Sequence, residues 1–456
     1  MGSLSKFIER LGPAQYVFNA LVITGALIAL LLAFILARRT LRARYLAVRD
    51  RRTLAIRQRW PQIVSGSAAD AWRFDVLDCE IVEAILTDRL EVCSPEEAEE
   101  LTALLRNSGL LDTRIHQARA HRGWKRRHAL VSLGRMRMPE AIPALAEALD
   151  DRDAETRIAA ARGLGRSGMP MAAAPILERL RFGLLRVPER PLLNALLNCC
   201  RPRPEILVPY LRTADDAARP LLARVLGEIA TPELEEDLLL LAADPIAEVR
   251  ASAARALAHA KPRLALTALS NLAGDPEWFV RLRAVVALGV LEDPRTIPVL
   301  IETLCDPNRY VRLRSAAALA ALDGQIEEII QQVLHSRDRY ALQAFISEME
   351  RTGALPQLVE ALVDPLRHEY AEEALLGALR AGTQRHLLDS MSRHPQARVR
   401  KAVARLLARS HEPKLIPAVE RAEAAARSRR EQRMARWLLA RLRQMEPALV
   451  PEKAPA

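Results

Sequence analysis

The sequence is poor in aromatic residues and in cysteine. Phe, Trp and Tyr make up only 4% of the 456 residues, although half of all residues are apolar. β-Sandwiches draw on aromatic and β-branched side chains, so this composition disfavours an all-β fold and favours closely packed helices. The 18 glycines and 28 prolines are too few for a collagen-like or low-complexity chain. The five cysteines form no C-x-x-C pair, which disfavours a disulfide framework and fits a reducing compartment.

The basic residues are concentrated in two segments of the chain. Of the formal charge of +11, residues 38–59 contribute +8 and residues 398–445 contribute +10. The charges of the two termini outside these segments, +1 and −1, cancel, which leaves −7 for residues 60–397. A protein that binds nucleic acid along its length needs a basic stripe throughout. Nucleic acid is therefore disfavoured as a partner.

A long uncharged stretch lies near the N-terminus. No charged residue occurs between Arg10 and Arg38, and the 20 residues Val17–Leu36 are almost all apolar. Twenty helical residues span the ~30 Å hydrocarbon layer of a membrane. We therefore expect a short N-terminal segment at 1–15 and a transmembrane helix at 16–37. The competing interpretation is a cleaved signal peptide, whose apolar core is normally only about 7–15 residues long.

Arginines follow the apolar stretch directly, in a predicted basic juxtamembrane helix at 38–59. Because positive residues stay on the cytoplasmic side, we expect a single-pass protein of the cytoplasmic (inner) membrane, with its N-terminus outside. Gly25 and Ala29 are four residues apart, a spacing at which transmembrane helices approach closely, so pairing into a homo-oligomer is one interpretation. The other is that small residues are simply common in such helices. The first arginines, candidates for contact with the membrane or an acidic partner, are Arg38, Arg39, Arg42 and Arg44.

A repeat of about 31 residues occupies the middle of the chain. Val249-Arg250, Val280-Arg281 and Val311-Arg312 recur at a spacing of 31, and each opens an alanine-rich apolar helix. A turn, a second helix and an Asp-Pro pair complete the unit, and looser copies extend the pattern in both directions. We expect about ten units at 124–430, preceded by a helical N-terminal cap at 60–123 and followed by a basic capping helix and tail at 431–456.

The repeat resembles the HEAT repeat, particularly the short bacterial form that also occurs in phycobilisome lyases. Val-Arg opens the first helix, Leu-Gly closes it, and a second helix containing Pro-x-Leu follows. The resemblance covers residues 124–425 and implies an all-α solenoid, in which stacked helical hairpins bury their apolar faces and expose an extended binding surface. It leaves the function open.

The resemblance also implies a ladder of aspartates and arginines, six residues apart, along the inner turns. Each Asp lies at a loop and bonds backbone N–H groups or the next Arg. We expect this ladder to be structural, because every Arg has its own Asp; the alternative is a row of arginines that binds anions. The pairs are Asp151/Arg157, Asp244/Arg250, Asp275/Arg281 and Asp306/Arg312.

Four of the 18 aromatic residues occupy one register of the repeat. They precede the Val position, or its substitute, in four successive units at intervals of 31, 30 and 30. They either staple neighbouring repeats together or form a ridge that binds a partner, since aromatic side chains are favoured anchors at interfaces. These residues are Phe279, Tyr310, Tyr340 and Tyr370.

Motifs of catalysis are scarce. The G-x-G-x-x-G match at 163–168 closes a helix, whereas a dinucleotide fingerprint follows a strand and opens one; we expect helix-capping glycines there. The spacing of His116, His121 and His128 does not suit a metal site. Adjacent Cys199 and Cys200 lie on an apolar helix and are expected to be small core residues. We expect a protein that is not an enzyme and has no cofactor or bound metal.

A second basic cluster lies near the C-terminus, with one acidic residue, Glu431, among five arginines. It is either the solvated face of a polar solenoid cap or a contact with anionic lipid headgroups or an acidic partner. The arginines are Arg427, Arg429, Arg430, Arg433 and Arg436.

These features predict a bacterial, membrane-tethered scaffold or adaptor whose HEAT solenoid binds a membrane-associated protein, such as a membrane glycosyltransferase or an export complex. The alternative, implied by the resemblance alone, is a bilin lyase or isomerase.

Overall fold

The computed structural model describes residues 13–64, 75–322, 325–382, 384–410 and 412–444. Within these ranges every regular element is a helix, as the composition predicts. The chain divides into two compact units, the first ending at Ala172 and the second beginning at Ala173. Most of the predicted N-terminal segment at 1–15 and the tail at 445–456 lie outside the described residues.

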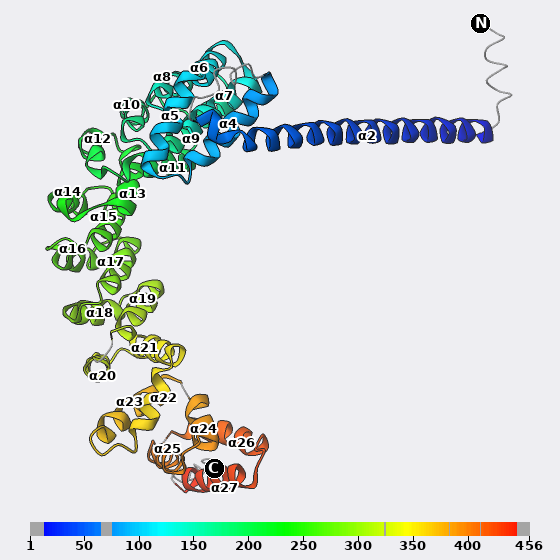
Figure 1. The fold of residues 1–456 in the computed structure, drawn as a ribbon. Coiled ribbons are helices and arrows are strands. Elements are labelled where there is room, and N and C mark those ends of the chain that lie inside the picture. The colour runs from blue at the N-terminus through cyan, green and yellow to red at the C-terminus, as the bar shows by residue number, and fades with distance from the viewer. Residues whose placement is uncertain (1–12, 65–74, 323–324, 383, 411, 445–456) are drawn as a thin grey trace, which may run out of the picture. The chain divides into compact units, whose positions relative to one another are not determined.

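The first unit combines one long helix with a group of shorter ones (Figure 1). Helix α2 (Pro13–Gln58) runs without interruption through the predicted transmembrane and juxtamembrane segments. The other elements are α3 (Trp60–Val64), α4 (Val76–Leu90), α5 (Pro95–Asn107), α6 (Leu110–Ala120), α7 (Gly123–Met136), η1 (Pro139–Ala141), α8 (Ile142–Glu147), η2 (Ala148–Asp150), α9 (Ala154–Ser167) and η3 (Pro170–Ala172).

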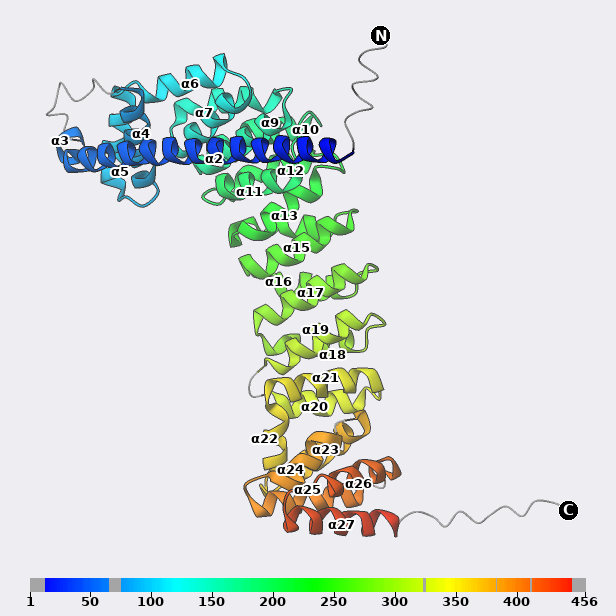
Figure 2. The ribbon, with the colours of Figure 1, turned by 90° about the vertical axis from the view of Figure 1, so that its right-hand side faces the viewer.

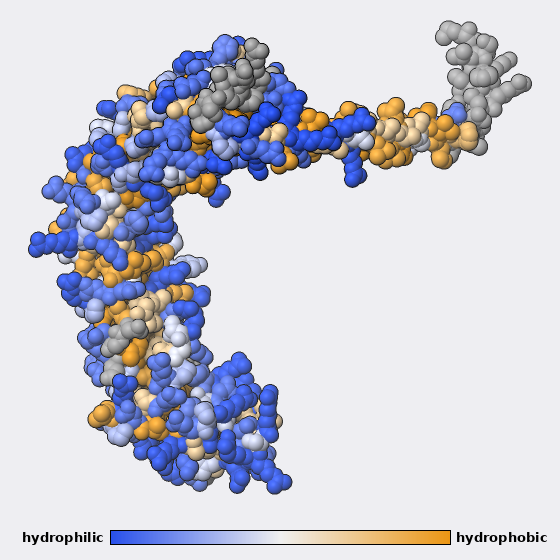
Figure 3. Space-filling view, viewed as in Figure 1, coloured by the Kyte–Doolittle hydropathy of each residue, from blue (hydrophilic) through white to orange (hydrophobic). Residues whose placement is uncertain are grey.

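The two halves of α2 have different surroundings. The first half is long and apolar enough to cross a membrane, and none of that stretch is buried against the described part of the chain. Figure 3 shows this hydrophobic surface giving way to hydrophilic surface along the helix. The other end of α2 packs against α4, where Ile56 and Trp60 are buried and Arg52 forms ion pairs with Asp75 and Asp78.

The helix after residue 94 begins and ends as its sequence predicts. Ser94 is the N-cap of α5, and its hydroxyl accepts a hydrogen bond from the backbone N–H of Glu97 at 3.3 Å. Pro95 occupies the first turn, where it loses no helical hydrogen bond. Ser108 ends the helix, and Gly109 adopts a left-handed conformation with φ of 70°. The residues at both ends of α5 therefore account for its bounds.

The second unit is a stack of helical hairpins. Its elements are α10 (Ala174–Arg181), α11 (Glu189–Cys200), η4 (Pro204–Leu207), α12 (Val208–Thr213), α13 (Arg219–Ile229), η5 (Pro232–Leu234), α14 (Glu235–Ala242), α15 (Ala247–Ala260), α16 (Ala265–Ala273), α17 (Trp278–Leu291), η6 (Pro294–Thr296), α18 (Ile297–Leu304), α19 (Arg309–Ala320), α20 (Ile326–His335), α21 (Arg339–Thr352), α22 (Ala354–Ala361), α23 (His368–Ala381), α24 (Gln384–Arg393), α25 (Ala397–Arg409), η7 (Pro413–Leu415), α26 (Ile416–Ala424) and α27 (Arg429–Arg443).

Alternate helices of the second unit form two layers. One layer contains the first helices of successive repeats, α13, α15, α17, α19 and α21, each packed against the next. The second helices α14, α16, α18 and α20 lie on the other side (Figures 1 and 2). Val249, Val280 and Val311, which open three first helices, are fully buried between the layers. Each of the ten predicted units has its first helix, in the series α7, α9, α11, α13, α15, α17, α19, α21, α23 and α25.

Glycines of the Leu-Gly positions lie inside helices rather than at their ends. A Cβ on Gly134 in α7 would lie 2.5 Å from the Cα of Gly163 in α9. A Cβ on Gly289 in α17 would lie 3.0 Å from the Cβ of Ala318 in α19. The motif at 163–168 closes its helix as expected, because Gly168, with φ of 65°, is the C-cap of α9. Gly163 lies inside α9, where it lets neighbouring first helices approach closely.

The last helix covers the end of the second unit. Helix α27 packs against α24, α25 and α26, and it buries Leu438, Leu439 and Leu442 on one face. Its arginines are exposed. The units that begin near Tyr340 and Tyr370 keep the buried register with Ala341 and Ala371, both fully buried, in place of Val.

Candidate binding surface

The aspartates of the ladder shape the loops between repeats. Each carboxylate accepts a hydrogen bond from the backbone N–H two residues later, over 2.7–2.9 Å. This bond fixes the turn that leads into the next first helix. The four aspartates are Asp151, Asp244, Asp275 and Asp306.

The arginines of the ladder join one repeat to the next. Nη1 of each donates to the backbone carbonyl of the Asp six residues earlier, at 2.8–2.9 Å, and to the carbonyl that follows it. The carboxylate partner belongs to the following unit: Arg250 pairs with Asp275 at 2.7 Å and Arg281 with Asp306 at 2.6 Å. Each of the arginines Arg157, Arg250, Arg281 and Arg312 thus contacts its own Asp through that residue's main chain.

Three further residues extend the ladder beyond the sequence prediction. Arg126 pairs with Asp151 at 2.6 Å, and Arg219 approaches Asp244 at 3.7 Å. Arg400 donates to the carbonyls of His394 and Pro395, so a histidine takes the aspartate's position. The Val-Arg pattern identified neither Arg126 nor Arg219, because Lys125 and Ala218 precede them.

Charge is compensated at the central rungs. Burial raises the pKa of Asp275, but hydrogen bonds from Arg250 and from the backbone of Glu277 outweigh it, so that its pKa lies below the ordinary value. The bond to Asp275 in turn raises the pKa of Arg250. Arg250 and Arg281 therefore present no unpaired charge to an anion, which favours the structural interpretation at these rungs.

The aromatic register divides into exposed and half-buried rings. Tyr310 and Tyr340 are 63% and 65% exposed, whereas Phe279 and Tyr370 are half-buried. The guanidinium of Arg312 lies 5.5 Å from the ring centre of Tyr340, where earlier rungs have a carboxylate. Stapling and partner binding both remain predictions for these four residues.

Trp278 joins the aromatic register although it lies one position earlier. Its ring centre is 6.1 Å from that of Phe279, edge to face, and 6.2 Å from that of Tyr310 on the next helix. The indole is 42% exposed. Register counting missed it because Arg309 and Arg339 occupy the same position in the following units.

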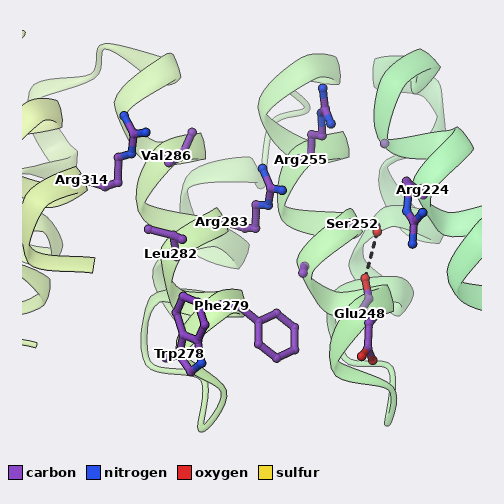
Figure 4. A pocket seen from close by; sticks show the side chains of 12 residues that line it. Arg224, Glu248, Ser252, Arg255, Trp278, Phe279, Leu282, Arg283, Val286 and Arg314 are labelled. Atoms are coloured by element: carbon purple, nitrogen blue, oxygen red, sulfur yellow. Dashed lines mark hydrogen bonds between the residues drawn. The ribbon is translucent and has the colours of Figure 1, made fainter. Parts of the chain in front are cut away.

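A groove of about 680 Å³ crosses the first-helix layer of the second unit beside these rings. Figure 4 shows Trp278 and Phe279 at one end of helix α17, with arginine side chains on this helix and its neighbours. The arginines that line it are Arg224, Arg255, Arg283 and Arg314, on α13, α15, α17 and α19 respectively.

The two basic segments differ in their surroundings. Arg38, Arg39, Arg42 and Arg44 are exposed on α2. In the C-terminal segment Arg436 pairs with Glu423 at 2.7 Å, and the backbone N–H of Arg427 donates to Glu431 at 2.9 Å. Three exposed residues have no carboxylate within ion-pair distance in the part of the chain that the structure describes, namely Arg429, Arg430 and Arg433.

The other chemical motifs lie in the packed helices. Burial raises the pKa of Cys199 and of Cys200 to about 12, so both remain thiols at neutral pH. Among the described residues, no group of three His, Cys, Asp or Glu side chains is arranged to hold a metal ion.

Parts of the chain match the model of a known repeat family. The family model for HEAT repeats matches residues 111–182, 204–289, 235–320 and 266–350. No curated protein matches the chain.

Solved structures with some similarity share 16–19% sequence identity with the chain. An engineered protein covers 84% of this chain and 98% of its own, at 19% identity and a TM-score of 0.29. Human deoxyhypusine hydroxylase in complex with glycerol covers 54% and 96%, at 19% identity and a TM-score of 0.23. The complex of CpcE and CpcF of phycocyanin lyase from Nostoc covers 58% and 96%, at 16% identity and a TM-score of 0.22. Scores this low carry no argument about activity.

The matched repeats coincide with the stacked helical hairpins, whose Asp loops and Val-Arg helix starts follow the same register. The chain is a HEAT-repeat protein, an all-α solenoid with one long apolar helix near its N-terminus.

Proposed function

We propose that this protein is a scaffold, held at the cytoplasmic membrane by α2, whose HEAT repeats position a protein partner on the cytoplasmic side. The observation that carries the proposal is the first half of α2. Its side chains are apolar and exposed, and no other described helix covers them. An exposed apolar surface of this length is stable in a lipid bilayer but costly in water.

The uninterrupted helix α2 sets the distance between the membrane and the solenoid in this proposal. If residues 17–36 cross the bilayer, the helix continues past Arg38 to its first packed contacts near Arg52 and Ile56. At 1.5 Å per residue, about 14 exposed helical residues form a spacer of about 20 Å between membrane and solenoid. The basic residues of this spacer lie within reach of anionic headgroups at its membrane end.

The partner is a protein because stacked repeats expose a long surface that suits an extended interface. We expect it to be membrane-associated, with a membrane glycosyltransferase or an export complex as the first classes to test. Gly25, whose absent Cβ meets no atom within 4 Å, leaves space for close pairing of two α2 helices into a homo-oligomer.

The test combines localisation, topology and capture. The full-length chain is expected in the carbonate-resistant membrane fraction, and a matched variant without residues 17–36 is expected in the soluble fraction. A C-terminal alkaline-phosphatase fusion is expected to be inactive, and a fluorescent-protein fusion fluorescent. Detergent-solubilised full-length protein is expected to copurify a membrane protein that mass spectrometry identifies. An active phosphatase fusion, or full-length protein in the soluble fraction, contradicts the proposal.

A further inference from the structure

The groove on the first-helix layer carries basic charge that the fold does not use. Arg283 on α17 and Arg314 on α19 are 31 residues apart, so they occupy the same position in consecutive repeats. Both side chains are exposed, and neither has an ion pair or hydrogen bond with the described part of the chain. They differ in this respect from Arg250 and Arg281, whose guanidinium groups form ion pairs in the ladder and whose side chains are only 14% and 15% exposed.

The neighbouring arginines of the groove are partly neutralised. Arg224 pairs with Glu189, and Arg255 pairs with Glu228 at 2.6 Å. Glu248 lines the groove on α15, where its backbone carbonyl accepts a hydrogen bond from Ser252 (Figure 4). The unpaired positive charge is therefore concentrated over α17 and α19.

An apolar surface adjoins this charge. Leu282 and Val286 line the groove on α17, and Trp278 and Phe279 lie at the N-terminal end of the same helix. The exposed rings of Trp278 and Tyr310 lie next to each other across two repeats, tilted by 33°. Exposed Trp, Tyr and Arg side chains next to each other are the residue types that dominate the binding energy of protein interfaces.

We propose that this groove binds an extended acidic peptide segment of the partner protein, with carboxylates at Arg283 and Arg314 and an apolar side chain against Trp278. This inference rests on the proposed scaffold function and specifies the site at which it acts. Packed helices lie 8–10 Å apart, and an extended peptide advances about 3.3 Å per residue. Two acidic residues about three positions apart therefore match consecutive repeats.

The charges favour a peptide over a nucleic acid. A nucleic-acid backbone brings a phosphate at every nucleotide and requires a run of unpaired cations. Here Glu248 lies in the groove and Glu189 and Glu228 lie beside it. Residues 60–397 as a whole are also acidic. A peptide can place two carboxylates at the two unpaired arginines, and its neutral side chains can contact the remainder of the groove.

The experiment uses the full-length protein in nanodiscs of neutral lipid and fluorescence anisotropy at low salt. The probe is a fluorescein-labelled 12-residue peptide with one Phe and two Glu three positions apart; its control has Gln in place of both Glu. The acidic peptide is expected to bind about 10-fold more tightly, because each exposed ion pair changes affinity by a factor of up to about 5. Increasing salt is expected to remove the difference.

Matched variants locate the site. The double variant Arg283→Gln/Arg314→Gln is expected to bind the acidic peptide only as well as the neutral one. Arg263→Gln, an exposed arginine outside the groove, is expected to leave binding unchanged. Trp278→Ala is expected to weaken both peptides by a similar factor. Circular dichroism establishes that each variant is folded, and Arg283→Lys, which keeps the charge, is expected to retain most of the affinity.

Three results overturn the inference. They are equal binding of the acidic and neutral peptides, wild-type affinity in the double variant, and tighter binding of a 12-nucleotide single-stranded oligonucleotide than of the acidic peptide. If the double variant also still captures the wild-type partner from solubilised membranes, the scaffold function stands and the groove is excluded. If the wild-type protein captures no membrane protein, the scaffold function itself fails.

Discussion

The substitution Arg250→Ala tests whether the ladder joins neighbouring repeats. Nε and Nη2 of Arg250 donate to the two carboxylate oxygens of Asp275 at 2.7 and 3.0 Å. Nη1 donates to the carbonyls of Asp244 and Pro245 at 2.9 and 3.0 Å. The side chains of Arg250 and Asp275 are only 14% and 6% exposed. The alanine variant leaves a nearly buried carboxylate whose remaining hydrogen bond comes from the backbone N–H of Glu277.

The expected loss of unfolding free energy lies between the values for a fully buried and a surface ion pair. Breaking a fully buried pair by removing one partner costs about 3–5 kcal/mol, and a surface pair contributes about 0–1 kcal/mol. For this partly shielded bidentate pair we expect about 2–3 kcal/mol of lost unfolding free energy. In a unit of this size that loss lowers the melting temperature by about 3–5 °C.

Calorimetry with a matched control measures the effect. Arg255 lies on the same helix, but its ion pair with Glu228 is more exposed, so Arg255→Ala is expected to lower the melting temperature by no more than about 2 °C. The double variant Arg250→Met/Asp275→Asn is expected to recover part of the loss, because no unpaired charge remains. Equal melting temperatures for Arg250→Ala and Arg255→Ala refute the reasoning.

The pH dependence has a defined sign. The pKa of Asp275 lies below its ordinary value in the folded protein. Its stabilising contribution is therefore complete above the unfolded pKa of about 3.9 and is lost as the pH falls through the folded pKa. The difference between wild type and Arg250→Ala is expected to be constant from pH 5 to 7 and to shrink below about pH 4. A difference that persists at pH 2 contradicts this assignment.

Three further predictions address packing, reactivity and the basic end of the chain. Gly134→Ala is expected to lower the melting temperature by several degrees, because the new Cβ lies 2.5 Å from the backbone of a neighbouring helix. In the control Gly274→Ala the nearest atom is 3.6 Å away, so the melting temperature is expected to change little. Equal melting curves for the two variants contradict this prediction. In a variant that retains only Cys199 and Cys200, a thiol reagent at pH 8 is expected to label neither until denaturant is added, because burial raises their pKa values to about 12; rapid labelling of the native protein contradicts it. Residues 38–456 are expected to bind anionic vesicles in a salt-sensitive way, as measured by cosedimentation. Neutralising three residues of α27 is expected to weaken this binding by about 1 kcal/mol per basic contact. Unchanged sedimentation excludes a lipid contact by these three residues, Arg429, Arg430 and Arg433.

The fold was predictable because equivalent residues in successive repeats pack in the same way. The Val that opens each first helix is fully buried in α15, α17 and α19, and Ala substitutes for it at 341 and 371 without changing the register. A periodic sequence gives each hairpin the same apolar face, and stacking is the way to bury it. The first helices of all ten predicted units consequently lie where the periodicity placed them.

The pairing within the ladder was less accessible to sequence reasoning. A spacing of six within a unit suggests that Arg250 belongs with Asp244, yet its guanidinium pairs with the carboxylate of Asp275, 25 residues further on. The distance between consecutive repeats decides the choice, and one unit's sequence does not contain that distance. The same limitation affected the glycines, because the close approach of Gly134 to Gly163 joins two helices of different repeats.

The candidate groove depends on departures from the repeat rather than on the repeat itself. Side chains that serve the stacking of the repeats find their partners within the solenoid; the guanidinium of Arg281, for example, pairs with Asp306. Arg283 lies two residues later on the same helix, yet its side chain is exposed and contributes to neither the core nor the ladder. Trp278 breaks a register in which the following units have arginine, and it places an exposed indole beside that charge. Arg283 forms no ion pair among the described residues and the indole of Trp278 is 42% exposed, so a partner that covers both gives a physical reason for their position.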